Sequence, residues 1–497
     1  MKKFARISAL MLALVMMLSM FASCGTDPAG NPSDTTKAPD SGITPDTDDK
    51  GEEKILPNLP EIRYDGYDYR IRVKGEATYW STIGIDAEQK TGEPINDSAL
   101  ERNSAIEEKY GVTVSVIEGG DVGGAVVQTV LTQVDEFDLA IINPEDLGQV
   151  APKSVYDLNQ LQYIDLEKPW YDQNFNKEVS IGGRLYSTTG DLVLNDDNGT
   201  WAILFNKTLT EDFTDIPNLY QLALDGKWTL DKLYEYAKIV ASDITGDQVM
   251  DENDRWGFQT ESFNLYATVA ASGEKIASKD ANDMPYLTAN TERFQDVFTK
   301  TVNIYGDKSV SMYYNDYTTK YSGYDFFIGA FNDGRVLMKM SGLYDLTLAR
   351  DMDDEVGVLP MPKYDESQPT TKNPITVYNA TCVCIPISVG DVERTSILTE
   401  AMFAESRYTT RVAFYEQTLK KKYSPDEETK LVLDQVIENR TYDLGIIYGW
   451  GGVLDRISSL MENRATNFAS SWKSLERVAQ RALEQTIKDF NKAQNAG

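Results

Sequence analysis

The sequence predicts an α/β fold in which helices pack on a mostly parallel sheet. The first observation is the segment 137–142, FDLAII, a nearly unbroken apolar run typical of a strand buried on both faces. The second is the alternation of strand-like and helix-like segments on both sides of it. The third is that no internal repeat occurs at solenoid spacing. Successive strand–helix units are therefore expected.

Ordered structure is expected to begin near Arg63. The first predicted helix has a clear start and stop, because Asn96 or Asp97 can cap it and Gly111 stands where helices favour glycine. A second helix is expected over 124–134. The strands expected in this part of the chain cover 64–73, 112–117 and 137–142.

The strand–helix pattern resumes after residue 200. Thr229 can cap a helix over 230–240, and a long helix is expected to include 474–490. Gly334 interrupts the segment 331–340, which indicates a turn followed by a strand. The further strands expected cover 201–205 and 356–359.

Composition excludes several kinds of chemistry. The formal net charge is −30 and the chain contains no histidine. Such an acidic protein is expected to repel nucleic acid. Separately, we expect the protein to be a monomer. Without histidine, Ser–His and Cys–His catalysis and the commonest zinc ligand are excluded.

The N-terminus predicts export and a lipid anchor. Residues 1–23 combine a short basic region, an apolar run of about 15 residues and small residues, which is the pattern of a signal peptide. Cys24 follows directly and resembles the lipidated cysteine of bacterial lipoproteins, although Phe21 stands where leucine is usual. The alternative is cleavage near Ser23 and release. Residues 24–59 contain few large apolar side chains and are expected to form a disordered tether. We therefore expect the protein at the outer face of the cell membrane.

Two further cysteines, Cys382 and Cys384, lie in a strand-like run. Neighbouring same-face positions on one strand are poorly placed for a disulfide. A soft-metal site would need further Cys or His ligands, which the chain lacks. Both cysteines are therefore expected to be buried.

The segment 243–254, DITGDQVMDEND, resembles a calcium loop of the EF-hand kind. Oxygen-bearing side chains stand at loop positions 1, 3, 5, 9 and 12, and Ca²⁺ prefers oxygen ligands. Gln248 replaces the usual turn glycine, and the alternative is an acidic solvated loop. The expected ligands of a structural Ca²⁺ are Asp243, Thr245, Asp247, Asp251 and Asp254, with the carbonyl of Val249.

Aromatic residues in expected loops are candidates for carbohydrate binding, because their flat apolar faces match the C–H faces of sugars. The candidates are Trp80, Trp170, Tyr171, Trp201, Tyr266 and Trp450. A glycosidase carboxylate pair could be sought at Asp196 and Asp197 or at Asp353 and Asp354. Adjacent carboxylates rarely flank a scissile bond, so no enzyme activity is expected.

The order of several short segments resembles the family 1 extracellular solute-binding proteins of bacterial sugar ABC importers, the maltose-binding-like group. The resemblance covers about residues 62–490. The matching segments are 137–142 with 156–158, 181–186, 205–207, 226–230, 331–338 and 357–363.

The resemblance implies a periplasmic-binding-protein-like fold, with two α/β lobes and a ligand cleft between them. Lobe one would hold 60–187 and 322–376, and lobe two 188–321 and 377–497. The cleft would receive Asn143, Pro144 and Glu145, the pair Gly190-Asp191 and the Tyr266 region. The expected ligand-binding residues are Trp80, Asn143, Glu145, Asp191, Trp201, Tyr266 and Trp450.

The function implied is capture of a sugar, expected to be an oligosaccharide, by hinge closure and its delivery to the permease subunits of an ABC importer. Two alternatives stay open. One is a surface glycan-binding lipoprotein without a permease, and the other is a carboxylate glycosidase.

Overall fold

A computed structural model describes residues 54–76, 80–349, 352–415 and 427–494. The fold below is that of the unit that begins at Ile55. Cys24, the expected signal peptide and most of the expected tether lie outside the described residues. In the part of the chain that is described, no helix combines the length and the apolar character needed to cross a membrane.

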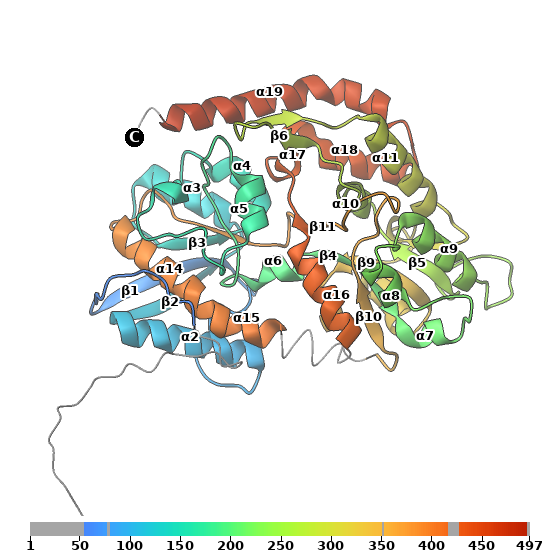
Figure 1. The fold of residues 1–497 in the computed structure, drawn as a ribbon, viewed down its shortest axis with the longest axis horizontal. Coiled ribbons are helices and arrows are strands. Elements are labelled where there is room, and N and C mark those ends of the chain that lie inside the picture. The colour runs from blue at the N-terminus through green and yellow to red at the C-terminus, as the bar shows by residue number, and fades with distance from the viewer. Residues whose placement is uncertain (1–53, 77–79, 350–351, 416–426, 495–497) are drawn as a thin grey trace, which may run out of the picture. The chain divides into compact units, whose positions relative to one another are not determined.

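The first sheet, called sheet A, has four strands in the order β12-β3-β1-β2 (Figure 1). The central strand β1 pairs in parallel with β2 and β3, and only β12 runs antiparallel. Helices α2 and α14 pack together on one face and α3 on the other. The bounds are β1 Tyr67–Lys74, β2 Val112–Gly119, β3 Leu139–Ile142, β12 Cys382–Cys384, α2 Pro94–Tyr110, α3 Val122–Thr132 and α14 Val392–Tyr408.

The second sheet, called sheet B, has five strands in the order β10-β4-β9-β5-β8. It is mixed: β5 is parallel to β8 and β9, whereas β4 is antiparallel to β9 and β10. The strands are β4 Trp201–Asn206, β5 Trp256–Thr260, β8 Ser311–Tyr313, β9 Val336–Gly342 and β10 Val356–Leu359. Helices around this sheet are α7 Lys207–Glu211, α8 Leu219–Leu224, α9 Leu230–Val240, α11 Glu292–Tyr305, α12 Asp325–Asn332 and α16 Glu427–Glu438.

Helix α9 shows how local sequence and packing agree. The hydroxyl of Thr229 accepts a hydrogen bond from the main-chain N–H of Lys232 at 3.3 Å, which caps the helix as predicted. Leu233, Ala237 and Val240 are buried against sheet B. Gly257 on β5 lies so close to α9 that a Cβ there would stand 2.0 Å from the carbonyl oxygen of Ala237.

We call sheet A with its helices lobe A, and sheet B with its helices lobe B. The predicted segment boundaries do not match this strand pairing. Strands β9 and β10, expected in lobe one, pair with β4 and β5 in sheet B, and β12, expected in lobe two, pairs with β3 in sheet A. Local patterns define strands but not partners, because partner choice depends on distant segments.

The chain passes between the lobes through three short segments. The first contains α6 (Leu194–Asn198) before β4, the second runs from β11 (Asn373–Pro374) to β12, and the third follows α15 (Thr410–Val412). β11 pairs with β13 (Arg440–Thr441). The remaining elements are η1 Pro144–Asp146, α4 Leu147–Val150, η2 Leu158–Gln160, α5 Gln173–Val179, α10 Asn264–Ala271, β6 Ala277–Lys279, β7 Pro285–Leu287, η3 Tyr314–Asp316, α13 Asp345–Leu348, α17 Leu444–Ile447, η5 Trp450–Gly452, α18 Val453–Glu462 and α19 Phe468–Gln494.

A buried ion cluster joins these passages. The guanidinium of Arg440, next to the second passage, contacts the carboxylates of Asp196 and Asp197 on α6 at 2.9 and 2.7 Å. It also contacts Asp172, the N-cap residue of α5, at 2.6 Å. Burial raises the pKa of Asp196 well above its usual value, against the opposing effect of Arg440. The cluster fixes α5, α6 and β13 to one another.

The predicted burial of the two cysteines is confirmed. Cys382 and Cys384 form β12, carry free thiols and are fully buried in sheet A. Burial raises the pKa of the Cys382 thiol, so it behaves as a small apolar residue.

Candidate functional site

An aromatic hollow lies where the second passage leaves lobe B. It is lined by Trp201 at the start of β4, Phe263 before α10, the passage residues 374–378, and Leu454 of α18. Its exposed ring is Phe263, whose side chain is 40% exposed. The Phe263 and Tyr378 rings meet edge to face, with centroids 5.9 Å apart. We call this hollow the aromatic groove.

The strand register explains how Trp201 reaches the groove. Trp201 is the first residue of β4 and lies opposite Gly342, the last residue of β9. The carboxyl end of a sheet strand is where ligands bind in α/β proteins. The carbonyl oxygen of Trp201 accepts a hydrogen bond from the Asn373 side chain at 2.8 Å, and this bond connects the groove to β11.

Two carboxylates lie near the Tyr378 hydroxyl. Burial raises the pKa of Tyr378 to about 12, and the negative charges of Asp455 and Glu145 add to this shift. Asp455 comes from α18 and Glu145 from η1, which follows β3 of sheet A. The groove itself is lined mainly by aromatic and apolar residues, and these two carboxylates act on Tyr378 from outside its lining.

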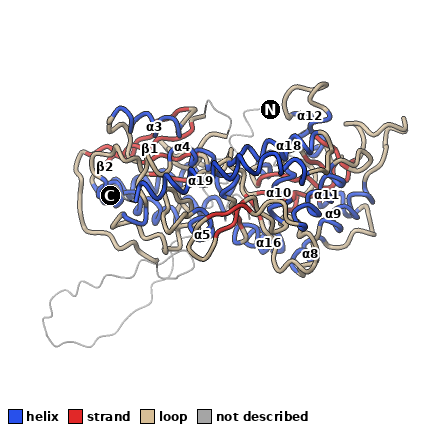
Figure 2. Tube along the Cα trace, turned by 90° about the horizontal axis from the view of Figure 1, so that it is seen from above, coloured by secondary structure: helices blue, strands red, loops and turns tan. Residues whose placement is uncertain are grey.

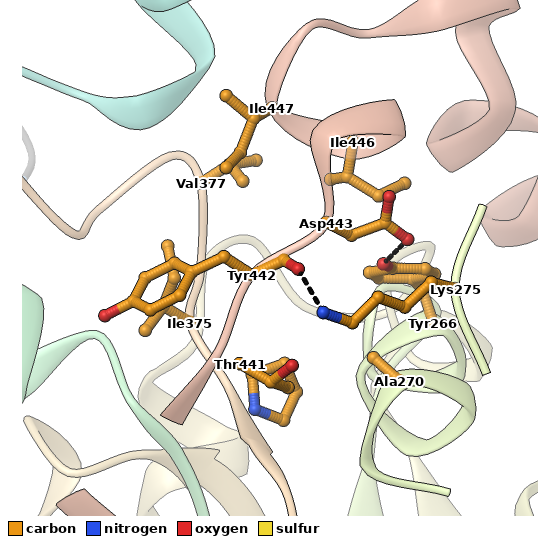
Figure 3. Close-up of a pocket in the computed structure, with 11 residues that line it drawn as sticks. Tyr266, Ala270, Lys275, Ile375, Val377, Thr441, Tyr442, Asp443, Ile446 and Ile447 are labelled. Carbon is orange, nitrogen blue, oxygen red and sulfur yellow. Dashed lines mark hydrogen bonds between the residues drawn. The ribbon is translucent and has the colours of Figure 1, made fainter. Parts of the chain in front are cut away.

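A second hollow adjoins the groove and shares Tyr266, Ile375 and Ile446 with it (Figure 3). The Tyr266 hydroxyl donates to the buried carboxylate of Asp443 at 2.5 Å. The ammonium of Lys275 donates to the carbonyl oxygen of Tyr442 at 2.7 Å. Because these polar groups are satisfied within the protein, this hollow forms a rigid, mainly apolar floor rather than a recognition surface.

The Asp443 network explains that rigidity. Besides Tyr266, the carboxylate accepts hydrogen bonds from the main-chain N–H groups of Ile276, Ala277 and Gly445, at 2.6, 3.2 and 2.8 Å. Burial raises the pKa of Asp443, while these hydrogen bonds act in the opposite direction. The network joins α10, β6 and α17 beneath the groove.

The predicted residues Asn143 and Glu145 lie beside the second passage. The Asn143 side chain donates to the carbonyl oxygen of Ala380 at 2.8 Å, which fixes the end of β3. Glu145 is exposed, and its N–H donates to the carbonyl oxygen of Val377 at 3.4 Å. Burial of part of the carboxyl group and the charge of Asp146 raise the pKa of Glu145.

Trp80 lies apart from the residues that line the groove. It follows β1 of sheet A, has a left-handed backbone with φ of 58°, and packs on Tyr344 beyond β9, with ring centroids 4.2 Å apart. The ring therefore bridges the two lobes. Trp80 follows β1, Trp201 begins β4 and Glu145 follows β3, and their role in ligand binding stays a prediction.

Several predicted ligand contacts are corrected by burial. Trp450 is only 1% exposed, packs on Tyr448, and donates its indole N–H to Thr486 at 2.9 Å. Trp170 and Tyr171 are also buried. Tyr266 lies in a helix rather than a loop and is 7% exposed, so it contributes to the floor of the groove. A tryptophan's surroundings cannot be read from its neighbours in sequence.

Asp191 is a further correction. Its carboxylate forms ion pairs with Arg407 at 3.2 Å and Arg411 at 2.9 Å, and its side chain is 12% exposed. Burial raises its pKa to about 6, although both arginines act in the opposite direction. These pairs tie the segment before α6 to α14 and α15, and Asp191 is not among the residues that line the groove.

The carboxylate pair Asp196 and Asp197 is buried and held by Arg440. A pair engaged in this way has no access to a glycosidic bond.

Sequence reasoning missed Phe263 and Tyr378. Phe263 comes three residues after the buried strand β5, and strand ends are where binding residues gather. This position just after a strand end could have identified Phe263 from the sequence. Nothing local marks Tyr378, since its place at the groove depends on the passage between the sheets.

The acidic loop has the backbone turn of a calcium loop without a converged ligand set. Gln248, at position 6, adopts φ of 70°, as the usual glycine would. Asp243 accepts hydrogen bonds from the N–H groups of Gly246 and Gln248, and Asp254 from those of Ile244, Thr245 and Asp251. Among the described residues, no group of three or more acidic or cysteine side chains is arranged to hold a metal ion.

Calcium binding at this loop stays a prediction with a direct test. Binding would exchange hydrogen bonds of Asp243 and Asp254 for metal contacts and raise the unfolding temperature by mass action. Calorimetric titration of the purified chain with CaCl₂ measures it, and Asp251→Ala should abolish the heat. Two results would contradict the prediction. One is no heat from the wild-type chain, and the other is a thermal shift of Asp251→Ala with MgCl₂ that equals the shift of the wild-type chain with CaCl₂.

The architecture defines the class of fold. Two α/β lobes, joined by several passages with aromatic and acidic groups beside one of them, form the periplasmic-binding-protein-like fold, as predicted. No protein-family model matches the chain, and no curated protein sequence does.

Three solved structures show the likeness. A cyclo/maltodextrin-binding protein complexed with maltotetraose is 15% identical, with a TM-score of 0.52 over 86% of this chain and 97% of its own. An ABC substrate-binding protein from Listeria monocytogenes in complex with cycloalternan is 14% identical, with a TM-score of 0.51 over 87% and 99%. The GacH receptor of Streptomyces glaucescens, solved unliganded and with acarbose, is 13% identical, with a TM-score of 0.52 over 86% and 98%.

Proposed function

We propose that this chain is an extracellular solute-binding lipoprotein that captures an oligosaccharide in the aromatic groove and delivers it to the permease of an ABC importer. The observation that carries the proposal is the groove itself, where Trp201, Phe263 and Tyr378 lie near the carboxylates of Glu145 and Asp455. The three similar structures named above are described with maltotetraose, cycloalternan and acarbose, and they support the same ligand class.

The chemistry of the groove suits a sugar. The flat faces of Phe263 and Trp201 offer apolar contact to C–H groups. The carboxylates of Glu145 and Asp455 offer acceptors for hydroxyl donors, in hydrogen bonds strengthened by their charge. Since Glu145 belongs to lobe A and Phe263 to lobe B, a sugar that contacts both favours the arrangement in which the lobes close on it.

The lipid anchor at Cys24 belongs to this proposal. A tether over 24–59 would let the two-lobed body reach a permease while it stays on the membrane. Metabolic labelling with a fatty acid tests it, because Cys24→Ala should abolish the label. Permease genes beside this gene would support delivery to an importer, and their absence would favour a glycan-binding lipoprotein without a permease.

The binding test uses the saccharides of the similar proteins as probes. Calorimetric titration with maltotetraose, cycloalternan and acarbose is expected to give a micromolar dissociation constant for at least one, about −8 kcal/mol. Phe263→Ala should weaken the binding of that ligand about tenfold, or roughly 1.4 kcal/mol, because the ring face that contacts the sugar is lost. Leu131→Ala is the control, since Leu131 is 74% exposed on α3 and lies outside both the groove and the β6–β7 hairpin.

Two outcomes would overturn the proposal. One is that no oligosaccharide in a wider panel binds, and the other is that Phe263→Ala and Leu131→Ala have equal effects on binding. Release of reducing sugar from the same panel would instead establish a glycosidase.

A further inference from the structure

Helix α19 is attached to both lobes. It has 27 residues, which corresponds to about 40 Å at 1.5 Å per residue. Near its start, Phe468 stacks on Phe294 of α11 in lobe B, with ring centroids 4.5 Å apart. Figures 1 and 2 show the helix extending from α11 across to the elements around sheet A. A single rigid element therefore spans the two lobes.

The far end of α19 has its own anchor on lobe A. The Phe490 ring meets Tyr186 edge to face at 5.0 Å, and its carbonyl oxygen accepts a hydrogen bond from Arg184. One residue earlier, Asp489 pairs with Lys153 at 2.8 Å. Lys153, Arg184 and Tyr186 belong to the segment between β3 and α6, which pairs with the residues around β12 in lobe A.

The β6–β7 hairpin forms a second attachment to the same part of lobe A. The carbonyl oxygen and carboxylate of Asp283 accept hydrogen bonds from the N–H groups of Gly182 and Gly183, at 2.9 and 2.8 Å. The Ser180 hydroxyl donates to the same carboxylate at 3.1 Å, and Lys279 donates to the Ser180 carbonyl at 3.0 Å. The hairpin also contacts α19 through β7.

The hairpin attachment is polar and lies beside open space. A cavity of about 470 Å³ adjoins it, lined by Lys177 and Glu178 of α5 and by Lys275, Asp280 and Asp283. Polar contacts next to a roomy, charged cavity exchange readily for contacts with water, so this attachment can separate at low cost. An apolar interface of the same size would resist separation.

We propose that α19 and the β6–β7 hairpin act together as a strap that holds the two lobes in their ligand-competent arrangement, with Asp283 and Arg184 as positioning residues. The inference rests on the proposed function, because the strap acts on the two lobes that would enclose the ligand. When the strap is weakened, fewer ligand-free molecules have the lobes in the ligand-competent arrangement. The apparent affinity for the ligand falls in proportion to the fraction of molecules in that arrangement.

The test combines hydrogen exchange with titration. The amides of Gly182 and Gly183 report directly on the hairpin attachment, because Asp283 accepts their hydrogen bonds. Asp283→Ala removes the carboxylate acceptor of the Gly183 amide but keeps the carbonyl acceptor of the Gly182 amide. In the ligand-free full chain it should therefore speed exchange at Gly183 and in the last turns of α19. The same variant should weaken binding of the best saccharide from the panel at least threefold.

Asp215→Ala is the matched control, because Asp215 is exposed between α7 and α8 of lobe B and belongs to neither attachment. It should leave exchange at the last turns of α19 and the dissociation constant unchanged. Arg184→Ala should reproduce Asp283→Ala from the other attachment.

The strap is overturned if Asp283→Ala speeds exchange only at Gly183 and leaves α19 and the affinity as in the wild type. If no saccharide binds the wild-type chain, the proposed function fails. The exchange at α19 then still decides whether the strap exists.

Discussion

Arg440→Ala is expected to lower the free energy of unfolding by about 3–5 kcal/mol, the usual cost of removing one partner of a buried ion pair. The guanidinium is 8% exposed and contacts the carboxylates of Asp172, Asp196 and Asp197. Without it, three carboxylates are left in a buried region with no cation in contact. Urea unfolding monitored by tryptophan fluorescence measures the loss.

The reason for so large an effect is desolvation rather than attraction. Taking a carboxylate out of water costs several kcal/mol, which only a close cation and further hydrogen bonds offset. Arg440→Lys keeps the charge but loses the planar fork that contacts three partners at once, so it should recover only part of the stability. The exposed Arg477 on α19 supplies the control, and its alanine variant should stay within about 0.5 kcal/mol of wild type.

A multiple variant separates this explanation from simple loss of packing. Adding Asp196→Asn and Asp197→Asn to Arg440→Ala removes two of the uncompensated charges. The triple variant should therefore be more stable than Arg440→Ala alone, a non-additive result expected for residues in one network. A triple variant less stable than the single variant would contradict the charge argument.

The second large effect is a rise in stability on mild acidification. Glu400 on α14 is 1% exposed, and one of its carboxylate oxygens accepts hydrogen bonds from the Tyr171 hydroxyl at 2.5 Å and the Asp165 N–H at 3.3 Å. Burial raises its pKa to about 7, against the opposing effect of these hydrogen bonds. Asp191, with a pKa of about 6, acts in the same direction.

The sign follows from proton linkage. The folded chain holds a proton on Glu400 at pH values where the unfolded chain, with an ordinary pKa of about 4.3, has released it. This contribution is complete below about pH 4 and is lost as the pH rises through about 7. Lowering the pH from 8 to 5.5 should therefore stabilise the protein, by about 2 kcal/mol from Glu400 alone.

Matched variants isolate the buried group from the general relief of charge repulsion in a chain of net charge −30. Glu400→Gln should flatten the dependence of the unfolding temperature on pH and raise that temperature at pH 8. Glu393→Gln, an exposed acid on the same helix, should keep the wild-type slope. Equal slopes in all three proteins would mean that Glu400 is ionised in the fold.

Local sequence determined the elements and the class of fold. The periodicity of 230–240 and its threonine cap predicted α9 with its observed bounds, and the FDLAII run predicted the buried strand β3. The absence of histidine, a matter of composition alone, removed whole classes of catalysis. These conclusions depend on near neighbours or on counting, so the sequence suffices for them.

Tertiary structure alone decided which strands share a sheet and which aromatic rings face a ligand. Strands β9 and β10 joined sheet B, and Trp450 became core, because both outcomes depend on residues far away in the chain. Phe263 and Tyr378 meet only because a passage between the lobes returns past α10. A side chain's exposure is set by its partners in space, and the free energy of burial that selects those partners has no local signature.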